Sequence, residues 1–129
     1  MSHESLLRTF ESIPAHVNQD AHLIHRGRFM NALIRISVGE TAYLMNIQQG
    51  RIADLSQKMP LFQTADLVIS AGDEAWSALW EKFPKAGWHD LFALHKRGAM
   101  RIEGTSHLFF AHLQYLKDVL NIPRRYHGE

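Results

Sequence analysis

The spacing of apolar residues switches between two periods along this chain, and the switch near Gly72 constrains the fold more than any other feature. Across residues 29–55 apolar side chains recur at every second position, the period of a β-strand with one buried face. After Gly72 they recur every three to four positions, the period of an amphipathic helix. A run of strands followed by a run of helices predicts an α+β fold.

The first half contains four predicted strands, with tight turns at Gly39 and Gly50. The strands are expected at residues 32–38, 41–47, 51–55 and 65–70. We expect them to form an antiparallel meander, with one longer loop at residues 57–64 around Pro60.

Helices dominate the second half. They are predicted at residues 73–83, 88–97 and 105–121, with a short fifth strand at 100–103. Residues 1–28 form a helical N-terminal extension that Pro14 interrupts and Asn18 restarts. Since each amphipathic helix must bury its apolar side, the chain should form a five-stranded, mainly antiparallel sheet with helices packed on one face.

Composition narrows the classes of protein. A chain of 129 residues fits a single domain spanning residues 1–129. Its 14 Lys and Arg balance 13 Asp and Glu, so nothing in the charge suggests a nucleic-acid partner. No apolar run approaches the length of a membrane span and no secretory signal is evident, so we expect a cytoplasmic protein without integral membrane association. The absence of cysteine excludes disulfides and thiolate chemistry.

Several motifs, taken in order, resemble the sterol carrier protein type 2 family of lipid-transfer domains. The strand Ile34-Arg35-Ile36 leads into Tyr43-Leu44-Met45-Asn46-Ile47, and an acidic pair precedes a tryptophan in Asp73-Glu74-Ala75-Trp76. The clearest match is the segment from Arg97 to Gly104, Arg-Gly-Ala-Met-Arg-Ile-Glu-Gly, before a last apolar helix. The resemblance covers residues 29–120. It implies a tunnel between sheet and helices that holds a sterol, a fatty acid or an acyl-CoA, or an accessory role.

Aromatic and leucine side chains on the predicted helices are the candidate ligand-binding residues. Eight of them are expected to wall such a tunnel: Trp76, Trp80, Phe83, Trp88, Phe92, Phe109, Leu113 and Leu116. A stripe at helical spacing is also typical of solid core packing, and both interpretations stay open. If there is a tunnel, its entrance is expected at residues 83–88, where the chain reverses between two helices, with Lys85 on the rim and Trp88 reporting the ligand.

The sequence contains no residue pattern typical of catalysis or of metal binding. The nine histidines match no zinc pattern, and no nucleophile elbow, phosphate loop or dinucleotide fingerprint is present. We therefore predict no metal site and no cofactor, and these absences weigh against an enzyme. Two alternatives remain: a small cofactor-free isomerase or hydrolase that uses His95 or Asp90 beside the cavity, or an interaction module whose aromatic face forms a homodimer without a pocket.

Overall fold

The structure, a computed structural model, describes residues 2–60 and 63–126. The predicted loop at 57–64 therefore lies partly outside the described residues. The helices are α1 (His3–Glu11), α2 (Ile13–Asn18), α3 (Ala21–Arg26), α4 (Asp73–Leu79), α5 (Leu91–Lys96), α6 (Ser106–Ala111) and α7 (Leu113–Asn121), followed by a 3₁₀ helix (Ile122–Tyr126). The strands are β1 (Asn31–Val38), β2 (Thr41–Gln48), β3 (Arg51–Ser56), β4 (Leu67–Ala71) and β5 (Met100–Gly104).

The five strands form one sheet in the order β3-β2-β1-β4-β5. Every neighbouring pair is antiparallel except β1 and β4, which run parallel with Ile36 opposite Ile69. The predicted α+β fold with a mainly antiparallel sheet is confirmed. The predicted four-strand meander is wrong at β4, because the long connection after β3 lets the chain cross to the far side of β1.

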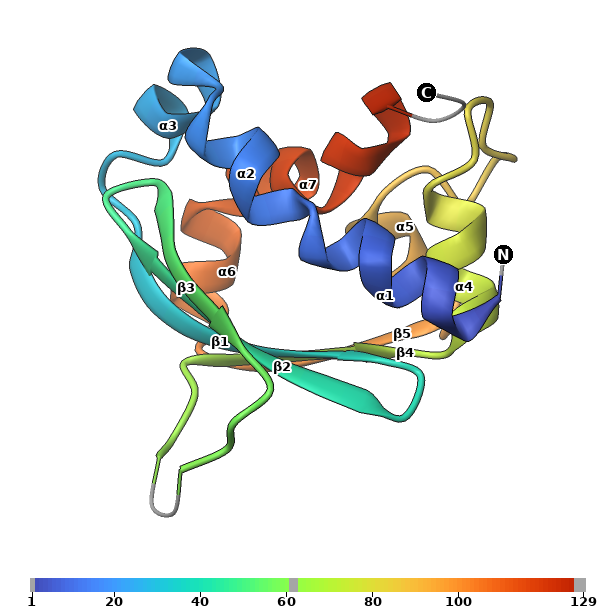
Figure 1. Cartoon of the computed structure of the whole chain (residues 1–129), viewed down its shortest axis with the longest axis horizontal. Coiled ribbons are helices and arrows are strands. Elements are labelled where there is room, and N and C mark those ends of the chain that lie inside the picture. Colours follow the sequence, from blue (N-terminus) through green and yellow to red (C-terminus); the bar gives the residue numbers. More distant parts are fainter. Residues whose placement is uncertain (1, 61–62, 127–129) are drawn as a thin grey trace.

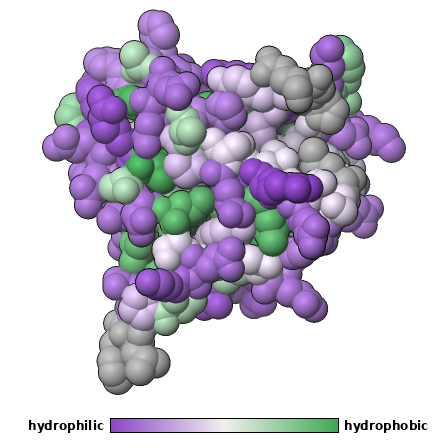
Figure 2. All heavy atoms as spheres, in the orientation of Figure 1, coloured by the Kyte–Doolittle hydropathy of each residue, from purple (hydrophilic) through white to green (hydrophobic). Residues whose placement is uncertain are grey.

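One face of the sheet carries the core. In β1 the residues Ala32, Ile34, Ile36 and Val38 are all buried, as their alternation predicts. The helices lie on this face, and the ends of the connection between β3 and β4 project away from the sheet on the opposite side (Figure 1). Figure 2 shows the same view with hydrophilic residues around the outside and hydrophobic residues gathered towards the middle.

The ends of two helices differ from prediction for identifiable reasons. Helix α4 ends at Leu79 instead of continuing towards Pro84, and the guanidinium of Arg124 donates two hydrogen bonds, of 3.1 and 2.6 Å, to the Leu79 carbonyl oxygen. Helix α5 starts at Leu91 and not at Trp88, because the Asp90 side chain accepts the backbone N–H of Ala93 and so caps the helix.

The N-terminal and C-terminal helices also divide differently. The predicted helix 105–121 is two helices, since the backbone leaves helical geometry at His112, with φ −119° and ψ 23°. At the N-terminus Asp20, not Asn18, caps α3. The Asn18 side chain instead exchanges two 2.9 Å hydrogen bonds with the backbone of Ile52, which fastens α2 to β3.

In residues 2–60 and 63–126, no helix is both long enough and apolar enough to cross a membrane.

Candidate functional site

A mostly apolar pocket of about 220 Å³ lies against the edge strand β5, beneath α5 and α6. We call it the α5–α6 pocket. Its lining residues are Leu67, Phe92, His95, Ile102, Glu103, Gly104, Ser106, Phe109 and Phe110. Leu67 and Phe109 are only 1% and 5% exposed and mark its inner end, whereas Phe110 is 60% exposed and marks its mouth. The pocket therefore runs from solvent towards the core.

Three phenylalanines give the α5–α6 pocket its shape. The ring of Phe110 stands nearly perpendicular to that of Phe92, at 6.4 Å and 75°, and to that of Phe109, at 5.2 Å and 73°. The ammonium groups of Lys96 and Lys117 lie 6.0 and 5.8 Å from the centre of the Phe92 ring. Edge-to-face contacts and cations over a ring each favour a fixed ring orientation, so the aromatic wall is held in place.

His95 is a polar group of this pocket with a defined hydrogen-bonding role. Its Nδ1 lies 3.2 Å from the carbonyl oxygen of Met100. Because a carbonyl oxygen only accepts, Nδ1 must carry the proton, and Nε2 of the neutral ring is left as an acceptor. The imidazole thus ties α5 to β5 while it lines the pocket.

The structure brings two of the eight predicted wall residues, Phe92 and Phe109, into the α5–α6 pocket, and the other six lie outside it. Trp76 and Trp80 are fully buried, with ring centres 5.4 Å apart. The indole N–H of Trp76 donates to the carbonyl oxygen of Ser37, so this tryptophan is fastened to the sheet.

The remaining four predicted wall residues are scattered. Phe83 is 83% exposed, and Leu113 and Leu116 pack on the core from α7. Trp88 is half-buried and lines a different cavity of about 340 Å³, which we call the Trp88 cleft. The full lining of that cleft is Asp73, Glu74, Ser77, Ala78, Glu81, Lys85 and Trp88.

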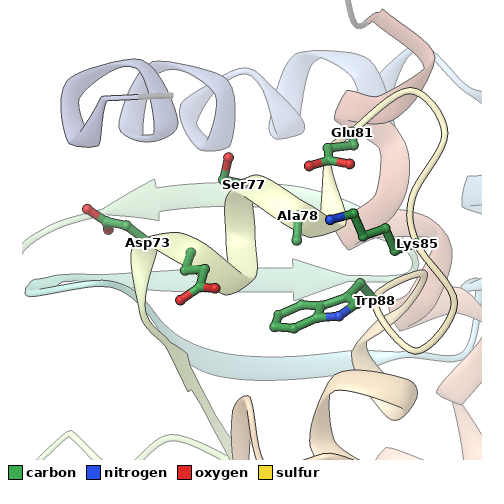
Figure 3. Close-up of a pocket in the computed structure, with 7 residues that line it drawn as sticks. Asp73, Ser77, Ala78, Glu81, Lys85 and Trp88 are labelled. Carbon is green, nitrogen blue, oxygen red and sulfur yellow. The ribbon is translucent and has the colours of Figure 1, made fainter.

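The Trp88 cleft has a more polar lining than the α5–α6 pocket. Figure 3 shows the indole of Trp88 across from Ala78, with Glu81 and Lys85 at one end and Asp73 at the other. The guanidinium of Arg97 lies 4.2 Å from the centre of the Trp88 ring. Lys85, which was predicted to lie on the rim of an entrance, lines this cleft. The cleft is also lined by three carboxylates, Asp73, Glu74 and Glu81. An apolar molecule bound there would gain little free energy, because these charged groups would lose hydration.

A hydrogen-bonded chain at the N-terminal end of α4 was not visible in the sequence. Nδ1 of His3 lies 3.0 Å from each carboxylate oxygen of Asp73, and Nε2 lies 3.0 Å from the hydroxyl oxygen of Thr41. Because the carboxylate only accepts, Nδ1 carries a proton, and Nε2 makes the hydrogen bond with the Thr41 hydroxyl. Asp73 lines the Trp88 cleft and Thr41 does not. These hydrogen bonds therefore chiefly join α1, α4 and the start of β2.

Asp90, the other candidate for chemistry, is occupied by structural contacts. One carboxylate oxygen accepts the Ala93 N–H at 2.8 Å, and the other lies 3.3 Å from the Lys117 ammonium and 3.5 Å from His89 Nε2. Burial works to raise the pKa of this carboxyl, but the Ala93 N–H and Lys117 outweigh it, and the pKa is lowered. Asp90 therefore serves as the ionised N-cap of α5.

Metal binding needs at least three converging ligands. In the part of the chain that the structure describes, no three His, Asp or Glu side chains are placed to hold a metal ion.

No family model matches the sequence, and no curated protein is similar to it in sequence. Solved structures do match. A crystal structure of sterol carrier protein 2 superposes with a TM-score of 0.70 at 14% identity, covering 91% of this chain and 94% of that one. The chain has the sterol carrier protein 2 fold. The resemblance seen in the motifs is thereby confirmed at the level of the fold.

Two further proteins with the sterol carrier protein 2 fold show how far sequences diverge within it. A Thermus thermophilus protein described as "possibly sterol carrier protein" matches with a TM-score of 0.67 at 13% identity, covering 92% of this chain and 85% of that one. The palmitated SCP2L2 protein of Aedes aegypti matches with a TM-score of 0.54 at 17% identity, covering 93% and 95%. At such identities the shared feature is the backbone arrangement, and the side chains of the site must be considered individually.

Proposed function

We propose that this protein binds an apolar small molecule in the α5–α6 pocket, without catalysing a reaction. The observation that carries the proposal is the pocket's graded wall, which passes from exposed Phe110 at the mouth to buried Leu67 and Phe109 at the inner end. Ligand sites are typically apolar cavities with a few polar groups, and His95 and Ser106 are such groups here.

The energetics support an apolar occupant over a polar one. Each methylene transferred from water to this wall contributes about 0.8 kcal/mol. The rings of Phe92, Phe109 and Phe110 offer no conventional hydrogen bond, so a polar group buried against them would lose its hydration, whereas an anionic head group beside Phe92 would lie near the ammonium groups of Lys96 and Lys117. The names of other proteins with this fold also favour an apolar ligand, since one is a sterol carrier protein and another is described as palmitated. Fatty acids, acyl-CoA and sterol-like molecules are therefore the first classes to test.

The proposal also includes the folding and the cellular location of the protein. Residues 1–129 act as one folding unit, which would appear as a single cooperative unfolding transition followed by two independent probes. The protein works in the cytoplasm on a freely diffusing ligand, and its mass in a native spectrum reports whether it does so as a monomer or a homodimer.

The experiment is native mass spectrometry of protein purified without detergent, followed by titration with apolar probes. A co-purifying apolar molecule, or saturable binding of a probe, supports the proposal. Phe92→Ala should weaken binding by about 1–3 kcal/mol through lost apolar contact. The matched control is Phe83→Ala, which removes the same ring from a site that is 83% exposed and outside the pocket.

Two results would contradict the proposal in different ways. A protein that binds none of the probe classes would favour the interaction-module alternative. Turnover that is lost in His95→Ala, with folding intact, would establish the enzyme alternative.

A further inference from the structure

The volume of the α5–α6 pocket is small for a sterol or a palmitoyl chain, the lipids that the names of similar structures mention. Its volume of about 220 Å³ lies between two reference points. A dry engineered cavity of about 150 Å³ is large enough for benzene. Pockets that enclose drug-sized ligands measure about 300–1,000 Å³. A single aromatic ring with a short substituent, or a chain of medium length, fits this space, and a sterol ring system does not.

The inner end of the pocket is closed by two residues of different kinds. Leu67 belongs to β4, where it pairs with Ile34 of β1 on one side and Gly104 of β5 on the other. A Cβ added at Gly104 would overlap the carbonyl oxygen of Asp66, so β4 and β5 are already in closest contact there. The pairing of β4 with β5 fixes the backbone here, and the Leu67 side chain is one apolar group at the closed end. Phe109 closes the end with a side chain alone.

Phe109 is also placed where the pocket would otherwise continue. It is the buried residue of α6 and joins the core cluster, while its neighbour Phe110 stays at the mouth. Behind the ring of Phe109 lies apolar core, so a smaller side chain there would extend the cavity inward and leave the mouth unchanged.

We infer that the α5–α6 pocket selects small apolar ligands, of one aromatic ring or a medium-length chain, and that Phe109 is the residue that sets the upper limit of size. The inference rests on the proposed function and narrows its ligand class. The nearly perpendicular rings of Phe92 and Phe110 would offer a flat ligand both a face and an edge.

The test is a series of straight-chain alcohols from butanol to hexadecanol, measured by competition against a fluorescent apolar probe. Affinity should rise about four-fold for each added methylene until the chain fills the pocket, and then stop rising. Butylbenzene should compete and cholesterol should not. In Phe109→Ala the plateau should move to longer chains, and in Phe109→Leu it should move by less. Phe83→Ala removes the same ring from a site that is 83% exposed and outside the pocket, so it is the matched control and its plateau should stay at the wild-type length.

The experiment distinguishes failure of the size limit from failure of the proposed function. If no alcohol of any length competes, the proposed function fails. If alcohols compete but affinity climbs steadily to hexadecanol, or cholesterol competes as well as butylbenzene, the size limit is overturned while apolar-ligand binding stands. An unchanged plateau in a folded Phe109→Leu protein overturns the role of Phe109. Wild-type data alone decide the size limit if both Phe109 variants fail to fold.

Discussion

The indole N–H of Trp80 donates a hydrogen bond of 2.7 Å to the backbone carbonyl oxygen of Leu120, and both residues are fully buried. This contact joins the end of α4 to the end of α7, two helices separated by most of the second half of the chain. A buried carbonyl at a helix end needs a donor, and the Trp80 ring supplies one.

Trp80 should therefore matter for stability in a way that an exposed aromatic residue does not. Trp80→Ala should lower the free energy of unfolding by about 3–5 kcal/mol, and Trp80→Phe by about 1–3 kcal/mol, since the smaller ring leaves the Leu120 carbonyl without its donor. Urea unfolding with an unchanged m-value measures both losses. Phe83→Ala is the control and should stay within about 0.5 kcal/mol of wild type. Equal losses for Trp80→Ala and Phe83→Ala would contradict this account of the core.

Alkaline pH should destabilise the fold through Tyr43. Burial, helped by the nearby Glu11 carboxylate, raises the pKa of Tyr43 from 10.0 to about 12. The folded state therefore holds the Tyr43 proton more tightly than the unfolded state does. The resulting stabilisation is complete below pH 10 and is lost as the pH rises to about 12.

Unfolding free energies measured at pH 9 through 12 test this expectation. The fall should be smaller in Tyr43→Phe, because a phenylalanine has no proton to lose. Tyr115, whose pKa burial also raises, should contribute in the same direction. A Tyr43→Phe protein whose stability falls as steeply as that of wild type would show that Tyr43 is not responsible.

Asp90 should act as a structural group with its own acid dependence. Its lowered pKa means that it stabilises the fold above its ordinary value of 3.8, and this contribution is lost as the pH falls through the folded value. Asp90→Ala should cost about 0.5–2 kcal/mol at pH 7 through loss of the α5 cap. Asp90→Asn keeps a capping oxygen, so it should cost less and should flatten the loss of stability in acid. An Asp90→Asn protein with the wild-type acid profile would refute the assignment.

Local spacing was enough to predict much of the sheet and the orientation of the aromatic residues. Alternation in β1 placed Ile34 and Ile36 on the buried face, and the four-residue spacing of Trp76 and Trp80 placed both rings together, as their 5.4 Å separation confirms. Spacing does not say what a helix face packs against. Whether Trp80 meets a cavity or a carbonyl depends on Leu120, and no local pattern links the two.

The features of the structure that the sequence did not predict depend on contacts between residues far apart in the chain. The parallel pairing of β4 with β1 follows from a crossover whose path the sequence does not encode locally. His3 and Asp73 are 70 positions apart, and the motif that contains Asp73 does not indicate His3 as its partner. Helical periodicity placed Phe92 and Phe109 on apolar helix faces, and the family resemblance made them candidate wall residues. Their meeting at one pocket required the tertiary arrangement of α5, α6 and β5.

The central claim is that an apolar ligand enters between α5 and α6, and photo-crosslinking with mapping of the labelled peptides tests it most directly. A straight-chain alcohol carrying a diazirine would be irradiated with the wild-type protein, with excess unlabelled alcohol as the competitor. The account predicts competable labels on the peptide that contains Phe109–Phe110, and on Phe92 when fragment spectra assign the label to single residues. Competable labelling confined to Trp88 and to the peptide that contains residues 73–81 would instead place the ligand at the Trp88 cleft and contradict the account.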